Sequence, residues 1–155
     1  MEEQMARRLV AAEGKKLQQA GLVARTWGNI SCRIDENHFV ITPSGLDYET
    51  MTAVDLVLMD IRNGVCCGAH KPSSEKGVHL AAYQTFPEVG YVIHTHQTYA
   101  TAIGLCGFEQ LAMTEEEAEK LGGISRAAYG LSSTEKLAGA VYDAMQSGAK
   151  VVFMV

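Results

Sequence analysis

The sequence has no excess of basic residues and no long apolar run. Its 155 residues include 13 Lys and Arg against 18 Asp and Glu, a formal net charge of −5. Nucleic acid and anionic membranes attract clustered positive charge, so neither is expected as a partner. No apolar stretch reaches the roughly 20 residues of a transmembrane helix, and the charged start has no signal-peptide core. We therefore expect a cytoplasmic protein.

The cysteines form no metal-binding or disulfide pattern. They are Cys32, Cys66, Cys67 and Cys106, with no CxxC pair among them. Two adjacent cysteines rarely suit a disulfide framework or a tetrahedral zinc site. We expect reduced thiols, in keeping with a cytoplasmic location.

The overall composition is typical of a single globular domain. The apolar fraction is 47% and the charged fraction is 20%. Apolar periodicity, turn residues and helix-capping residues predict alternating helices and strands. In order, the elements are helix 2–20, strands 30–34, 38–42 and 54–60, a helix from Ser73 or Ser74 to about Phe86, strand 91–94, helix 97–106, a helix from Thr114, a helix from Ser132 or Ser133 to about Gln146, and strand 150–155.

Two histidines follow the predicted strand 91–94 at alternate positions. In an extended segment the side chains of His94 and His96 project to the same face, which suits a divalent metal. A bare H-x-H is nevertheless more often a chance pattern, and catalytic zinc usually has three protein ligands. His38, His70 and His79 have no metal-like spacing, and His79 is better explained as a structural histidine.

Two serines and a glutamate stand at the start of the helix after residue 72. The hydroxyls of Ser73 and Ser74 at a helix N-terminus favour a bound phosphate. Glu75 in the first turn has two interpretations: it complements the helix dipole, or it faces a metal and moves a proton. The local pattern leaves both open.

Two polar loops contain glycine at positions where a ligand can approach the backbone. One contains Thr26, Gly28 and Asn29, and the other contains Ser44 and Gly45. Each loop alone is an ordinary turn. Together with Ser73 and Ser74 they offer polar groups that can converge on one phosphate.

Four segments carry a resemblance to a known family. They are GLVARTWGNIS (21–31), ITPSGLDY (41–48), KPSSEKGVH (71–79) and YVIHTHQTYATA (91–102). In this order they resemble the class II aldolase/adducin superfamily, and within it the L-fuculose-1-phosphate aldolases. The resemblance extends over essentially the whole chain, and four co-occurring motifs are far more specific than any one.

The resemblance implies a fold and an activity. The fold would be a three-layer α/β/α sandwich with a mixed, largely antiparallel central sheet, as a single domain over residues 1–155. The activity would be zinc-dependent cleavage of a ketose phosphate to dihydroxyacetone phosphate and an aldehyde. The assembly would be a cyclic homotetramer with active sites at subunit interfaces.

The resemblance also implies roles for individual residues. His94 and His96 match metal ligands, and Glu75 matches the acid/base carboxylate. The phosphate-binding positions match Thr26, Gly28, Asn29, Ser44, Gly45, Ser73 and Ser74.

Two features of the family have no counterpart in the sequence. A third metal-binding histidine follows the strand that corresponds to residues 151–155, beyond the last residue here. We therefore expect that the C-terminal part is missing and that zinc binding is weak or absent. The tyrosine that protonates the leaving aldehyde falls in the helix 114–121, which has none, and Tyr129 does not align with it.

Related activities remain as alternatives. A ribulose-phosphate 4-epimerase shares the chemistry, although such members tend to have Asp at the position of Glu75. A dehydratase of methylthioribulose phosphate is a second alternative. A non-catalytic adducin-like head or an inactive truncated remnant is the third, and the joint presence of Glu75, His94 and His96 argues against it.

Overall fold

An antiparallel sheet of five strands forms the centre of the structure. This computed structural model describes residues 1–107 and 111–154, and the strands lie in the order β4-β3-β2-β1-β5. Their bounds are β1 Asn29–Arg33, β2 His38–Ile41, β3 Val57–Asp60, β4 Cys66–Cys67 and β5 Tyr91–His94. A separate parallel pair consists of β6, Ile124–Arg126, and β7, Val151–Phe153.

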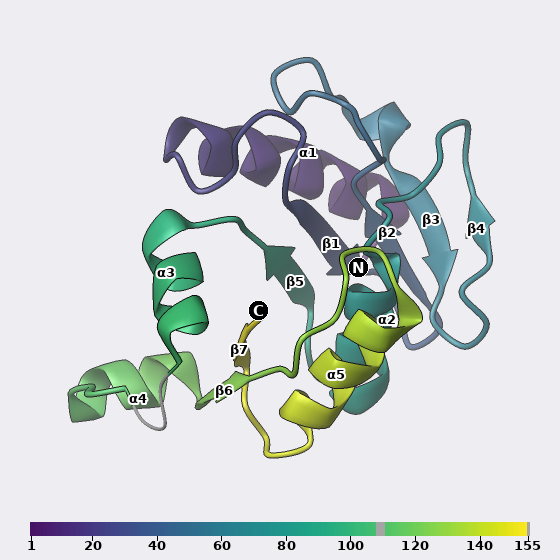
Figure 1. The fold of residues 1–155 in the computed structure, drawn as a ribbon. Coiled ribbons are helices and arrows are strands. Elements are labelled where there is room, and N and C mark those ends of the chain that lie inside the picture. The colour runs from purple at the N-terminus through teal and green to yellow at the C-terminus, as the bar shows by residue number, and fades with distance from the viewer. Residues whose placement is uncertain (108–110, 155) are drawn as a thin grey trace.

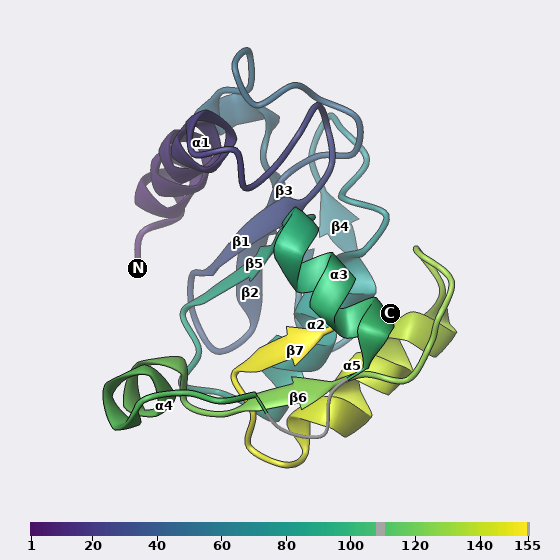
Figure 2. The ribbon, with the colours of Figure 1, turned by 60° about the vertical axis from the view of Figure 1, so that its left-hand side comes forward.

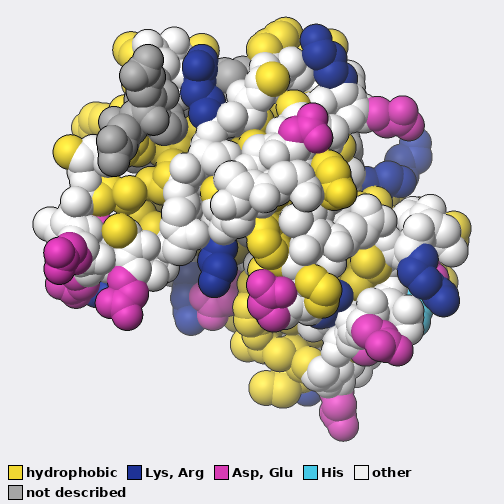
Figure 3. Space-filling model, turned by 90° about the horizontal axis from the view of Figure 1, so that it is seen from below, with side chains coloured by type: hydrophobic (Ala, Val, Ile, Leu, Met, Phe, Trp, Pro, Cys, Tyr) yellow, Lys and Arg dark blue, Asp and Glu magenta, His cyan; other side chains and the backbone are white. Residues whose placement is uncertain are grey.

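In the part of the chain that the structure describes, five α-helices and one short 3-10 helix surround the strands (Figure 1). They are α1 Glu3–Gln19, the 3-10 helix η1 Ala53–Asp55, α2 Lys76–Thr85, α3 Thr98–Cys106, α4 Glu115–Leu121 and α5 Glu135–Met145. Within the described residues, no helix combines the length and the apolar character needed to cross a membrane. On the face shown in Figure 3, Lys and Arg lie at separate places among acidic and apolar side chains.

Helices cover both faces of the sheet because its strands alternate their buried side chains. Ile30 and Val40 pack into one core with Val10 of α1. Phe39 and its neighbours on the other face pack against Tyr83 of α2. A third core joins α2 to α5, and Figures 1 and 2 show α1 on the opposite side of the sheet from these two helices. The predicted three-layer α/β/α fold with a largely antiparallel sheet is thus confirmed.

Several predicted boundaries differ from the structure. The strand predicted over 54–60 begins only at Val57, because Thr52 and Asp55 form a capping box around η1. Strands β4 and β6 were not predicted, since two or three residues are too short to show a period. The final strand is observed over Val151–Phe153, while Val155 lies outside the described residues.

Two helix caps also differ from prediction. Neither Ser132 nor Ser133 caps α5; the side chain of Thr134 does, by accepting a hydrogen bond from the backbone N–H of Leu137. At α2 the N-cap position is occupied by Glu75, whose side chain makes no capping hydrogen bond. The predicted caps, Ser73 and Ser74, stand before this position, and Glu75 remains at the positive end of the helix dipole.

Arg33 fastens the end of β1 to the end of α2. Its guanidinium donates hydrogen bonds to the carbonyl oxygens of Tyr83 and Val89, each at 2.8 Å, and of Phe86 at 3.2 Å. It also lies over the Tyr83 ring, 4.7 Å from its centre. These contacts fix α2, and with it Glu75, relative to the sheet.

Candidate active site

The candidate site lies where β1, β5 and the start of α2 meet. In the sheet, Asn29 at the beginning of β1 is paired with His94 at the end of β5. Glu75 approaches both from the N-terminus of α2, and its side chain and that of His94 are each only 8% exposed. Three elements that are distant in sequence thus bring polar side chains to one buried place.

Glu75, His94 and His96 form a possible metal-binding group. One potential ligand atom from each lies within 4.8 Å of the other two. Nδ1 of His94 is 2.5 Å from Oε2 of Glu75, yet this buried nitrogen has no partner in hydrogen-bonding geometry among the described residues. Two imidazoles and a carboxylate are a donor set that zinc accepts.

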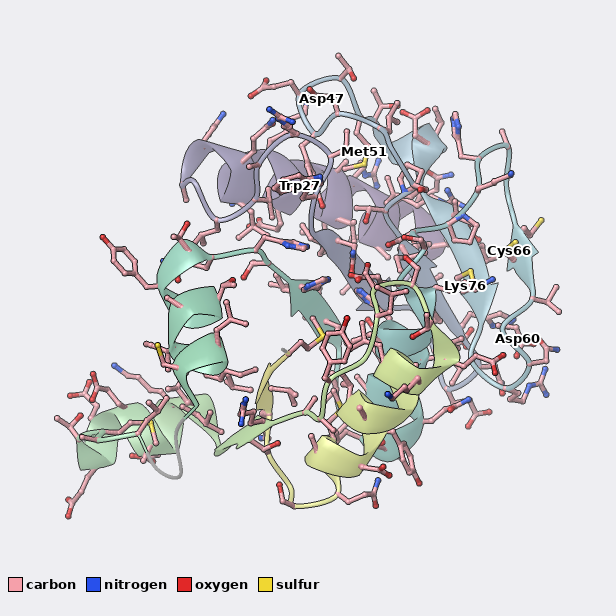
Figure 4. The ribbon with its side chains drawn as sticks, viewed as in Figure 1. Trp27, Asp47, Met51, Asp60, Cys66 and Lys76 are labelled. Carbon is pink, nitrogen blue, oxygen red and sulfur yellow. The ribbon has the colours of Figure 1, made fainter. Side chains whose placement is uncertain are left out.

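His96 is more exposed than His94 and lies just beyond the end of β5. The centres of the two imidazole rings are nevertheless 4.7 Å apart, so the alternate spacing does bring the two rings together as predicted. On its other side the His96 ring lies 5.9 Å from the ring of Trp27. Figure 4 shows Trp27 on the loop between α1 and β1.

Two further side chains donate hydrogen bonds to the Glu75 carboxylate. Oε1 accepts one from the Ser132 hydroxyl at 2.8 Å, and Oε2 accepts one from the Asn29 amide at 3.4 Å. The adjacent His94 imidazole, and then these two donors, lower the pKa of Glu75 to about 2 against the opposing effect of burial. Glu75 is therefore an anion at neutral pH, as a metal ligand must be.

A cleft of about 330 Å³ opens beside this group. All seven residues predicted to bind phosphate line it, together with Trp27, Pro43, Glu75, His96 and Ser132. Backbone hydrogen bonds from Ser44 to Lys71 and from Ser73 to Thr42 hold two of its loops together. The polar loops therefore converge, as the sequence predicts.

Sequence reasoning did not identify Ser132 as a site residue. It lies 57 residues from Glu75 along the chain, and its sequence signal was that of a helix cap. Trp27 and Pro43 were also not predicted to line the cleft. Tyr129 is 63% exposed and is not among the residues that line the cleft within this chain.

A family model described as "Class II Aldolase and Adducin N-terminal domain" matches residues 8–155. The chain belongs to this family. A solved structure of an L-fuculose 1-phosphate aldolase is 34% identical, with a TM-score of 0.88; the match covers 97% of this chain and 71% of that one. The resemblance stated from the sequence, and the assignment to class II aldolase-type enzymes of the lyase class, are therefore confirmed.

More distant structures share the fold. YgbL from Klebsiella pneumoniae is 22% identical with a TM-score of 0.87, over 100% of this chain and 76% of that one. An L-fuculose-1-phosphate aldolase from Thermus thermophilus is 24% identical with a TM-score of 0.73, over 92% and 70%. At these sequence identities the structural similarity supports a shared fold and nothing more.

Gly28 allows the backbone of its loop to approach His94. Its φ is +81°, and a Cβ built there would lie 2.8 Å from the His94 carbonyl oxygen and 2.7 Å from Val23. Gly45 has a similar φ of +74°, but a Cβ there would meet nothing within 4 Å. The two glycines share a left-handed backbone and differ in the space around them.

Because of this difference, alanine substitutions at Gly45 and Gly28 can be compared as a matched pair. Gly45→Ala should lower the free energy of unfolding by about 1 kcal/mol, the cost of a left-handed Cβ. Gly28→Ala should lower it by a further 1–3 kcal/mol or so, because the clash with His94 adds to that cost. Urea unfolding measures both, and equal losses would show that Gly28 is not needed for the close approach.

His79 supplies a pH-dependent contribution to stability. It is fully buried, and burial is the main reason that its pKa falls from 6.5 to about 3. Between these values the unfolded chain takes up a proton that the folded chain excludes, so stability should fall as pH falls below 6.5. Urea unfolding from pH 6.5 to 5 should show this slope, at most about 1.4 kcal/mol per pH unit from one proton. His79→Gln should reduce the slope, and an unchanged slope would mean that another group causes it.

Proposed function

We propose that this chain carries the site of a zinc-dependent aldolase that cleaves a ketose phosphate of the L-fuculose-1-phosphate type. The products would be dihydroxyacetone phosphate and an aldehyde. The observation that supports this most is the position of Glu75, His94 and His96 beside the cleft lined by the three polar loops. The 34% identity to an L-fuculose 1-phosphate aldolase supports the choice of substrate class.

The loops of the cleft would hold the phosphate group of the substrate. Ser73 and Ser74 precede the ten-residue helix α2, whose free N–H groups and dipole favour an anion. Thr26, Asn29 and Ser44 add polar side chains from the two other loops. Gly45 leaves room for phosphate oxygens near the backbone, because nothing lies within 4 Å of the position that a Cβ would take there. This local arrangement suits an anion although the chain as a whole is acidic.

The metal would be held by His94 and His96 with Glu75 as a third donor. The sequence led us to expect weak or no zinc, because it offers only two of the family's three histidines. Since Glu75 adds a third donor, we propose that zinc binds, because two histidines and a glutamate form a ligand set found in catalytic zinc sites. When bound, a divalent ion acts as a Lewis acid and stabilises negative charge that develops on the substrate as the carbon–carbon bond breaks.

Glu75 is the residue placed to move a proton. It lines the cleft, and its two oxygens accept hydrogen bonds from Ser132 and Asn29, which line the same cleft. In the cleavage direction the Glu75 anion would take the proton of the hydroxyl next to the breaking carbon–carbon bond and return it to the carbon of the dihydroxyacetone phosphate fragment. In the reverse direction the two transfers would run the other way. The nearby lysines, Lys71 and Lys76, need form no Schiff base in this scheme.

Zinc binding and cleavage can be tested together. Competition with a chromophoric chelator should give about one zinc per chain, and His94→Ala should weaken binding by a hundredfold or more, since a ligand contributes more than the tenfold to hundredfold of an outer-shell group. Glu75→Gln should abolish release of dihydroxyacetone phosphate from L-fuculose-1-phosphate in a coupled assay. His38→Ala, at a partly exposed histidine outside the site, is the matched control.

Two results would contradict the proposal. If His94→Ala binds zinc as the unmodified chain does, the metal site is elsewhere. If the zinc-loaded chain interconverts ribulose and xylulose 5-phosphates without releasing dihydroxyacetone phosphate, the epimerase alternative is correct. The cyclic homotetramer implied by the resemblance forms part of the same proposal.

A further inference from the structure

A buried line of hydrogen bonds leads from the core to Glu75. The Tyr83 hydroxyl is 2.7 Å from Oγ of Ser31, which is 2.6 Å from Nδ1 of His79. Nε2 of His79 is 2.5 Å from Oδ1 of Asn29, whose Nδ2 is 3.4 Å from Oε2 of Glu75. All five side chains are buried, and His79 and Ser31 have no exposed surface at all. None of the three inner residues, Tyr83, Ser31 and His79, lines the cleft.

The negative charge of Glu75 at one end decides which group donates and which accepts in each hydrogen bond of this line. A carboxylate only accepts hydrogen bonds, so Asn29 must turn its NH₂ group, not its carbonyl oxygen, toward Glu75. The carbonyl oxygen of Asn29 then faces His79 and needs a donor there. A neutral imidazole has one N–H, so it must be on Nε2. Nδ1 accepts from Ser31, and Ser31 accepts from Tyr83.

We propose that His79 is a positioning residue: as the Nε2–H tautomer it fixes the orientation of the Asn29 amide and so holds the Glu75 carboxylate in place beside His94. The effect on metal binding and catalysis rests on the function proposed above. The orientation of the amide does not, because it follows from the hydrogen bonds of the chain itself.

The chemistry of the alternatives explains why an imidazole is needed here. Without a donor at the position of Nε2, the Asn29 carbonyl oxygen would be left buried and unpaired. Rotation of the amide would relieve that, but it would aim the same oxygen at the Glu75 carboxylate. Either outcome loosens or displaces Glu75. The Ser31 side of His79 has no such consequence for the site.

Two substitutions at His79 separate its two ring nitrogens. The amide of His79→Gln reaches the position of Nε2 and keeps a donor toward Asn29. The amide of His79→Asn reaches only the position of Nδ1, so it can pair with Ser31 but not with Asn29. Both remove the imidazole from the core, so the thermal midpoints of both record any general loss of packing.

The first experiment uses the unmodified protein without metal. In protein labelled with ¹⁵N-histidine, the His79 resonances, assigned by their absence from His79→Gln, should report the Nε2–H tautomer throughout pH 5–8. The Asn29 side-chain NH₂ protons should exchange slowly with water, remain protected in His79→Gln, and lose protection in His79→Asn. An Nδ1–H tautomer, an imidazolium, or equal protection in both variants would overturn the proposal.

The second experiment uses zinc as the probe. His79→Asn should weaken zinc binding by about tenfold or more, the scale of outer-shell effects, while His79→Gln should stay within about threefold of the unmodified chain. In an Asn29→Ala background, His79→Asn should have no further effect, because its influence passes through Asn29. Equal losses in the two single variants, or additive losses in the double variant, would reduce His79 to a packing residue.

The two experiments distinguish failure of this proposal from failure of the proposed function. If the unmodified chain binds no zinc, the proposed metal site is wrong, and the tautomer and the amide protection still decide the role of His79. If zinc binds but the tautomer is Nδ1–H, the metal site stands and the positioning role is rejected.

Discussion

The contact between the Glu75 carboxylate and the His94 imidazole governs the arrangement of the site. Both side chains are nearly excluded from water, and an anion in such a place is costly unless partners compensate it. The partners come from separate parts of the fold: Asn29 from β1, Ser132 from the loop before α5, and His94 from β5. The carboxylate can therefore be stable only when the sheet, α2 and the α5 loop are all in place.

Other features of the fold hold Glu75 and His94 in this position. The antiparallel register between β1 and β5 places Asn29 opposite His94. Arg33 fastens α2 to the opposite end of β1, so the N-terminus of α2 is held at a fixed distance from the sheet. Gly28 lets the loop before β1 pass against the His94 carbonyl oxygen. The three polar loops of the cleft thus lie beside Glu75, His94 and His96 because the same strands and helix carry both.

The sequence predicted those parts of the site whose residues are close together in the chain. His94 and His96 are two residues apart, and Ser73, Ser74 and Glu75 are consecutive, so periodicity and helix-start signals reveal them. The resemblance then connected the separate segments. Ser132 carried no such signal, since its partner Glu75 is 57 residues away and its neighbour Thr134 provides the cap. His79 was recognised only as structural, because the polarity of its hydrogen bonds depends on Asn29, 50 residues away.

We propose above that Glu75, His94 and His96 hold one metal ion beside the cleft lined by the three polar loops. The most direct measurement is a crystal structure of the zinc-soaked protein with anomalous data collected at the zinc absorption edge. We expect one anomalous peak per chain among these three side chains, with Ser132 and Asn29 still paired with Glu75. A peak elsewhere, or no peak at this place in crystals shown to contain zinc, would mean that these three side chains do not form the metal site.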